Sequence, residues 1–219
     1  MAHVEISGKI EVVHVKNTGR CQELLLPGST VFVQEAESST RKTKYDLISV
    51  YKGDRLINMD SQAPNKVFAQ WVNEGHFLPE VTLIKPETRF GNSRFDFYLE
   101  TKTKRVFVEI KGVTLEEDGI VRFPDAPTLR GVKHLEELCA AAKQGYTAYA
   151  VFVVQMNHVI RLEPNDKTHP AFGQALRRAA KEGVHILALD CAVTPDSLCI
   201  ETPVEVKLTC SESWVAQQG

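Results

Sequence analysis

The chain has 219 residues, of which 43% are hydrophobic and 25% are charged, and these values are typical of a compact globular protein rather than a disordered chain. Lys and Arg number 26 against 28 Asp and Glu, giving a formal net charge of -2, so any nucleic-acid surface must be a local patch. The longest apolar stretch, Ala148 to Val154, is much shorter than a bilayer-spanning helix, and no signal-peptide pattern is visible. Five cysteines without a C-x-x-C pair are typical of free thiols. We therefore expect a cytoplasmic protein with no membrane partner.

Short runs of alternating apolar and polar residues fill the first third of the chain. The predicted strands are His3–Ile6, Lys9–Val13, Thr30–Gln34, Tyr45–Tyr51 and Arg55–Asn58. Ser7-Gly8 joins the first two in a tight hairpin, and Lys52-Gly53-Asp54 joins the last two. Five strands within about 60 residues predict a small closed barrel of the OB type, because closure removes exposed strand edges.

The pattern changes at Pro64, which is well placed as the first residue of a helix that ends at Gly75. We place a domain boundary here, between an OB-like domain over residues 1–63 and a second domain over residues 64–219. The further predicted elements are the strands Glu80–Lys85, Arg94–Glu100, Arg105–Lys111, Thr147–Gln155 and Val184–Leu189, and the helices Thr128–Gln144 and Ala171–Glu182. A hairpin followed by helix–strand alternation predicts a mixed α/β fold, with a mixed central sheet covered by helices.

Two neighbouring predicted strands of the second domain carry acids among apolar residues. Asp96 is flanked by two phenylalanines, and Glu109 and Lys111 lie two residues apart, hence on one face of their strand. A hairpin therefore brings the three side chains together as candidate catalytic residues. The two carboxylates and the backbone carbonyl of Ile110 form an oxygen-rich partial shell that suits Mg²⁺ or Mn²⁺. The charge of Lys111 can then orient or deprotonate an attacking water.

Basic residues in a loop of the small domain form a candidate nucleic-acid contact. Arg41, Lys42 and Lys44 lie between two predicted strands, and Arg20 can extend the patch. Loop cations of this kind suit contacts to phosphates, which provide affinity without sequence specificity. An ordinary solvated loop is the alternative.

A polar stripe on the long predicted helix contains the second candidate contact, which is formed by Arg130 and His134. Arg130, Lys133, His134 and Glu137 have the spacing i, i+3, i+4 and i+7, which a merely solvated helix face would also have. Arg130 lies in the first turn, where free N–H groups favour a phosphate. His134 borders the apolar side of the helix, where an imidazole can contact a substrate phosphate or water.

The spacing of the acids, D-x(12)-E-x-K, resembles that of the PD-(D/E)XK nuclease superfamily, although Phe95 replaces the proline. Longer motifs, in the same order along the chain, are similar to the sugar fermentation stimulation protein A (SfsA) family. These motifs are Asn17-Thr18-Gly19-Arg20, Arg41–Leu47, Gln62-Ala63-Pro64-Asn65, Ser93–Phe97, Val108–Lys111 and Phe123–Leu135. The resemblance implies an OB-like N-terminal domain, a PD-(D/E)XK (restriction-endonuclease-like) C-terminal domain, and a DNA-binding protein implicated in regulating sugar metabolism.

The resemblance also suggests a third metal-binding acid. Glu87 matches a family glutamate shortly before Asp96, and a surface acid beside Lys85 and Arg89 is its equally weighted alternative. Glu74 ranks below it, as an acid from the first helix, which superfamily members often use.

Two functions follow as hypotheses. The first is a DNA-binding protein with a Mg²⁺-dependent nuclease site, and the alternative is a non-catalytic DNA-binding regulator with the same fold. Two acids facing a polyanion favour the first, because without a metal ion they would repel it. RNA as the ligand, the strandedness of the substrate and the oligomeric state, a homodimer included, stay open.

Overall fold

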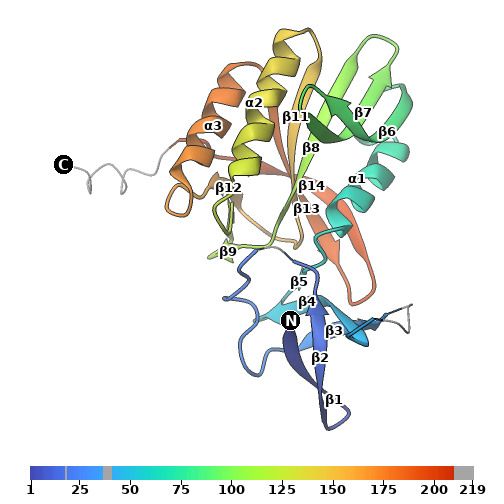
Figure 1. Ribbon diagram of the computed structural model, residues 1–219, viewed down its shortest axis with the longest axis vertical. Helices are drawn as coiled ribbons and strands as arrows, with labels where there is room; N and C mark the ends of the chain where they lie inside the picture. Colours follow the sequence, from blue (N-terminus) through green and yellow to red (C-terminus); the bar gives the residue numbers. More distant parts are fainter. Residues whose placement is uncertain (18, 37–40, 210–219) are drawn as a thin grey trace, which may run out of the picture.

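The computed structural model describes residues 1–17, 19–36 and 41–209, and its two sheets lie one above the other along the long axis of the molecule (Figure 1). The smaller sheet holds the five predicted strands of the first domain. They are β1 (Ala2–Ile6), β2 (Lys9–Val15), β3 (Val31–Glu35), β4 (Tyr45–Lys52) and β5 (Arg55–Asn58). The helix α1 begins at Ala63, beside the domain boundary predicted between residues 63 and 64, which stays a prediction.

The strand β4 organises the small domain because it has three partners. Its first half pairs with β2 in parallel, its second half pairs with β5, and β3 lies antiparallel along its other edge. Val13, Leu47, Val50 and Ile57 are fully buried in the enclosed core. No pairing between described residues joins β1 to β3, so the barrel is partly open, as OB barrels commonly are, rather than closed as the strand count predicted.

The larger sheet has nine strands and a mixed order, which confirms the predicted mixed α/β class. Its strands lie in the order β6-β7-β8-β11-β13-β14-β12-β10-β9. In chain order their bounds are β6 (Val81–Phe90), β7 (Ser93–Thr101), β8 (Arg105–Val113), β9 (Glu116–Glu117), β10 (Ile120–Phe123), β11 (Thr147–Val154), β12 (Arg161–Pro164), β13 (His185–Val193) and β14 (Leu198–Val206). The central strands β8, β11 and β13 are parallel, and a parallel sheet needs helices on both faces.

Three helices supply these covers. The helix α1 (Ala63–Asn73) lies on one side of the sheet, whereas α2 (Leu129–Lys143) and α3 (Pro170–Lys181) lie together on the other (Figure 1). Phe68 of α1 packs in a buried cluster with Phe97 and Val108, and Leu138 of α2 packs in a second cluster with Phe107 and Phe152. Among the described residues, no helix is long and apolar enough to cross a membrane.

Several strands were missed or underestimated from the sequence. The strand β6 continues five residues beyond the predicted end at Lys85, and β13 continues to Val193. The strands β9, β10, β12 and β14 were not predicted. Three of these have only two to four residues, and they exist because β10 pairs in parallel with the distant β12. A local pattern carries no signal for such a pairing.

A buried glutamate ties the two domains together. Glu116 of β9 is 6% exposed, and its carboxylate lies 2.8 Å from Lys52 Nζ and 2.7 Å from Arg55, both in the β4–β5 hairpin. Burial by itself raises the pKa of Glu116, but the hydrogen bonds from Lys52 and from the Gly119 N–H and the contact with Arg55 outweigh it and lower the pKa to about 2. The folded structure therefore favours the ionised carboxylate.

We expect Glu116→Gln to lower the free energy of unfolding at pH 7 by about 2 kcal/mol, because two cations lose a buried partner. The folded pKa of Glu116 lies below its ordinary value. Its contribution is therefore fully present above about pH 4.5 and is lost as the pH falls towards about 2. Urea denaturation of wild type and variant at pH 7 and pH 3 measures both effects.

The neighbouring Glu117→Gln is the control, because the Glu117 side chain is 75% exposed and its only described ion pair joins it to Arg122. It should change stability by less than about 0.5 kcal/mol. If Glu116→Gln lowers the free energy of unfolding no more than Glu117→Gln does, or if its effect does not decrease in acid, Glu116 does not hold the two domains together.

Candidate active site

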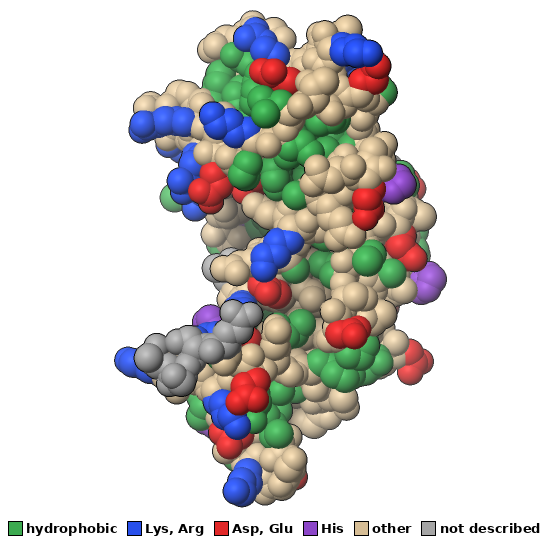
Figure 2. Space-filling model, turned by 90° about the vertical axis from the view of Figure 1, so that its right-hand side faces the viewer, with side chains coloured by type: hydrophobic (Ala, Val, Ile, Leu, Met, Phe, Trp, Pro, Cys, Tyr) green, Lys and Arg blue, Asp and Glu red, His purple; other side chains and the backbone are tan. Residues whose placement is uncertain are grey.

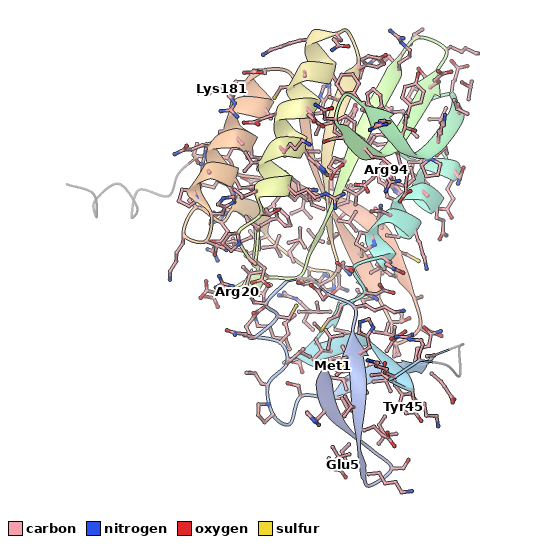
Figure 3. The ribbon with its side chains drawn as sticks, in the orientation of Figure 1. Met1, Glu5, Arg20, Tyr45, Arg94 and Lys181 are labelled. Atoms are coloured by element: carbon pink, nitrogen blue, oxygen red, sulfur yellow. The ribbon has the colours of Figure 1, made fainter. Side chains whose placement is uncertain are left out.

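A cleft of about 560 Å³ opens where the two domains meet. Its floor is the end of β8, from Glu109 to Val113, and one wall is the segment from Phe123 to Thr128 that leads into α2. Asn65 of α1 and groups of the small domain, among them Asn17, line the rest. Arg20, labelled in Figure 3, marks the level at which the two domains meet. The predicted residues Asp96, Glu109 and Lys111 all line this cleft.

Asp96 lies where β7 separates from β8. The ladder between these strands ends at the pair Phe97 and Val108. Beyond it, the Ile110 N–H donates to Asp96 Oδ2 at 2.7 Å, and Asn65 Nδ2 donates to Oδ1 at 2.8 Å. The Asp96 carboxylate thus replaces a strand carbonyl as the acceptor for the Ile110 N–H. This backbone donor therefore stays satisfied where β7 separates from β8.

Glu109 has two carboxylate oxygens in different surroundings. Lys111 Nζ donates to Oε1 at 2.6 Å, and His134 Nδ1 contacts the same oxygen. Oε2 is buried and has no hydrogen-bond partner among the described residues. An acceptor in this position costs free energy unless a donor or a cation reaches it.

His134 connects Glu109 to the first turn of α2. The imidazole is 5% exposed, and Arg130 Nε lies 3.3 Å from Nε2. A neutral ring with its proton on Nδ1 satisfies both contacts, because it donates to Glu109 and accepts from Arg130. His134 is therefore buried against the glutamate and does not line the cleft, whereas Arg130 is exposed and lines it. The predicted nucleic-acid contacts of both residues stay predictions.

The two acids have pKa values displaced in opposite directions. Burial and the nearby charge of Glu109 raise the pKa of Asp96, against the hydrogen bonds from Ile110 and Asn65. Burial also acts to raise the pKa of Glu109, but the hydrogen bond from His134 and the charge of Lys111 outweigh it, so this pKa is lowered. Glu109 is therefore the more readily ionised of the pair.

The donor set fits a hard divalent cation. Asp96, Glu109 and Ile110 line the same cleft, and a cation would satisfy Glu109 Oε2, which has no hydrogen-bond partner in the described part of the chain. No group of three or more His, Cys, Asp or Glu side chains suited to a metal ion occurs in the described part of the chain. Mg²⁺ needs only one or two carboxylates, because waters and substrate phosphates complete its shell.

The two additional acids considered from the sequence do not reach the cleft. Glu87 is on the edge strand β6, its side chain is 68% exposed, and it lies 3.3 Å from Arg94. Glu74 follows α1 and accepts a hydrogen bond from Gln70. Neither residue lines the cleft, whose third lining acid is Asp125, and Glu87 has the surface position of its alternative interpretation.

The basic loop of the small domain is largely engaged with neighbouring acids. Arg41 donates a bidentate pair of hydrogen bonds to the buried Asp46, at 2.7 and 2.6 Å. Lys44 lies 3.5 Å from Glu35 and over the Tyr45 ring. Lys42 is exposed, and the residues before Arg41, 37–40, lie outside the described part of the chain. On the face drawn in Figure 2, Lys and Arg side chains alternate with Asp and Glu and form no continuous basic patch.

Several cleft residues were missed because their chemistry is neutral. Asn65 and Gln155 line the cleft, and Gln155 Nε2 donates to Asn58 across the domain boundary. Position 112, next to Lys111, has little room for a side chain, because a Cβ there would lie 2.6 Å from Gln155 Oε1 and 2.9 Å from Pro64. The quoted motifs Gln62–Asn65 and Phe123–Leu135 contained a signal, but no spacing rule assigned a role to these side chains.

Comparison with known protein families agrees with this architecture. A model described as "SfsA N-terminal OB domain" matches residues 1–59, and one described as "Sugar fermentation stimulation protein RE domain" matches residues 62–197. The chain belongs to the sugar fermentation stimulation protein (SfsA) family. The OB-like N-terminal domain and the mixed α/β class are thus confirmed.

Individual relatives match nearly the whole chain. Proteins named sugar fermentation stimulation protein homolog from Clostridium beijerinckii and Desulfitobacterium hafniense are 58% and 62% identical, each over 95% of this chain and over 92% and 91% of their own lengths. The solved structure of Pyrococcus furiosus SfsA in complex with Ca²⁺ has a TM-score of 0.85 and 28% identity, covering 94% of this chain and 89% of that one.

We expect two substitutions to move the pKa of Asp96 in opposite directions. Glu109→Gln removes a nearby negative charge and should lower it, whereas Asn65→Ala removes a hydrogen bond to the carboxylate and should raise it. Carbon-detected NMR titration of the Asp96 carboxyl in metal-free protein measures both. Shifts in the same direction would contradict the arrangement described above.

Proposed function

We propose that the protein is a metal-dependent nuclease that binds DNA and hydrolyses its phosphodiester bonds in the cleft between the two domains. The observation that carries this proposal is the carboxylate of Glu109. Lys111 and His134 hold one of its oxygens, while the other is buried without a hydrogen-bond partner among the described residues. A buried carboxylate oxygen without a partner costs free energy, and a bound cation would remove this cost. A glutamate with a purely structural role would have no need of such an unsatisfied oxygen.

Asp96 and Glu109 would hold Mg²⁺ or Mn²⁺, with the Ile110 carbonyl as a further oxygen ligand. The Pyrococcus furiosus relative was solved in complex with Ca²⁺, which supports a divalent cation in this family member too. When bound, such an ion polarises a phosphate and makes a coordinated water more acidic.

The residues of the chain then have separate tasks. Lys111, two residues from Glu109 on the same strand face, supplies a fixed positive charge that orients the attacking water and offsets charge on the phosphate in the transition state. Arg130 lines the cleft beside the first turn of α2, where it can hold a neighbouring phosphate. His134 is a positioning residue, because it touches Glu109 and not the cleft.

The OB-like domain is proposed to hold the nucleic acid outside the cleft. Lys42 and Arg20 are its exposed candidates for phosphate contacts. Arg41 and Lys44 are paired with Asp46 and Glu35, so any phosphate contact of theirs would include these acids. The hypothesis of a regulator without catalysis assigns the same binding surface and no turnover, so an activity assay separates the two.

We expect the purified protein to cleave labelled DNA with Mg²⁺ or Mn²⁺ and not with EDTA. Glu109→Gln and Lys111→Met should each lower the cleavage rate by about 100-fold or more, because each removes charge from the reacting end of the site. Glu136→Gln, on the exposed face of α2, is the matched control and should cleave like wild type. DNA binding by wild type without metal-dependent cleavage would favour the non-catalytic regulator.

We expect His134→Ala to weaken Ca²⁺ binding by about 10- to 100-fold, as is usual when a partner that orients a metal ligand is lost. His134→Gln retains a donor and should restore part of the affinity. Lys133→Ala, on the adjacent exposed position of α2, is the control. Isothermal titration calorimetry measures all three, and equal affinities in wild type and His134→Ala would exclude the positioning role.

A further inference from the structure

We propose that the cleft admits one nucleic-acid strand at a time, so that the substrate is a single strand or a splayed single-stranded end and not an intact duplex. This inference rests on the proposed nuclease function and names the substrate class of the same site. Three features carry it: the depth of the acids, the two walls beside them, and the few cations that line the cleft.

The reacting side chains are recessed. The side chain of Glu109 is 5% exposed and that of Lys111 is 17% exposed, and Asp96 is held between α1 and β8 by Asn65 and the Ile110 N–H. A duplex is a broad cylinder whose major groove alone is about 12 Å wide. Groups at the bottom of a cleft reach its phosphates only if the whole cylinder enters, whereas a single strand is thin and flexible enough to descend to them.

Walls from both domains border these groups. Phe123 and Thr128 line the cleft from the large domain, and Asn17 and Ser61 line it from the side of the small domain. The cleft volume of about 560 Å³ is in the range of pockets that hold one small molecule, about 300–1,000 Å³. A nucleotide is a group of this size, but a base-paired double helix is not.

The walls are fastened to each other. The backbone N–H groups of Arg20 and Cys21 both donate to Asp125 Oδ2, and a Cβ on Gly19 would lie 2.7 Å from the same oxygen. Glu116 adds the ion pairs with the β4–β5 hairpin. Widening the cleft to admit a duplex would break these contacts, and the buried Glu116 would lose its partners.

The lining suits one strand rather than a duplex surface. Among the described residues, the cations that line the cleft are Lys111, Arg122 and Arg130, and Arg122 is already paired with Glu117 and Glu163. Duplex binding by electrostatics commonly uses about six to ten phosphate contacts. Besides the acids Asp96, Glu109 and Asp125, the lining includes neutral polar groups such as Asn17 and Ser61, which can bond the Watson–Crick base edges that only an unpaired strand exposes.

The test uses three fluorescein-labelled probes of one mixed sequence: a 20-nucleotide single strand, its duplex, and a fork with a splayed single-stranded arm, each prepared as DNA and as RNA. Fluorescence anisotropy with the full chain in Ca²⁺ measures binding, and gel analysis in Mg²⁺ or Mn²⁺ locates cleavage. With DNA probes, RNA probes or both, we expect the single strand and the fork to bind at least about 10-fold more tightly than the duplex. Cuts in the fork should be confined to its unpaired arm. Arg130→Ala should weaken single-strand binding by about 10-fold, and Lys133→Ala should not.

The outcomes separate this inference from the proposed function. Duplex binding and Glu109-dependent duplex cleavage as strong as those of the single strand would overturn the inference and leave the nuclease function standing. A preference for the single strand without cleavage of any probe would overturn the nuclease function and support the strand selection. Binding that ignores both strandedness and Arg130 would overturn the inference.

Discussion

The buried carboxylate of Glu109 requires compensation, and the arrangement of the large domain supplies it. An ionised group taken out of water is costly unless hydrogen bonds and opposite charges replace its hydration. Lys111 provides the charge from the same strand face, and His134 provides a donor from α2, which the cap at Thr128 helps to fix. These partners use only Oε1, and the buried Oε2 has no hydrogen-bond partner among the residues that the structure describes.

The opening of the sheet beside this carboxylate has its own physical cause. The Ile110 N–H would be unsatisfied where β7 leaves β8, and Asp96 accepts from it in place of a strand carbonyl. The same aspartate is thereby held at the cleft together with Asn65 of α1. Asp96 thus both ends the β7–β8 ladder and lines the cleft together with Glu109. The local fold and the candidate site therefore depend on the same side chain.

The small domain helps to build the candidate site. Its segments complete the walls of the cleft, and Asp125, Glu116 and Gln155 of the large domain bond to it through both backbone and side chains. The two family matches divide the chain between residues 59 and 62, yet the cleft is built across this division. The function is accordingly a property of the two domains together.

By itself, the sequence determined the elements with a regular period and the residues that share a strand face. Alternation located the five strands of the small domain, helical spacing located three helices, and the separation of two residues placed Glu109 beside Lys111. Tertiary structure decided what depends on distant partners. Arg41 is bound to Asp46, Glu87 lies exposed on the edge strand β6, and His134 contacts Glu109 and does not line the cleft. No local period encodes these outcomes, because a charged side chain's partner is selected by the packing of elements far apart in the chain.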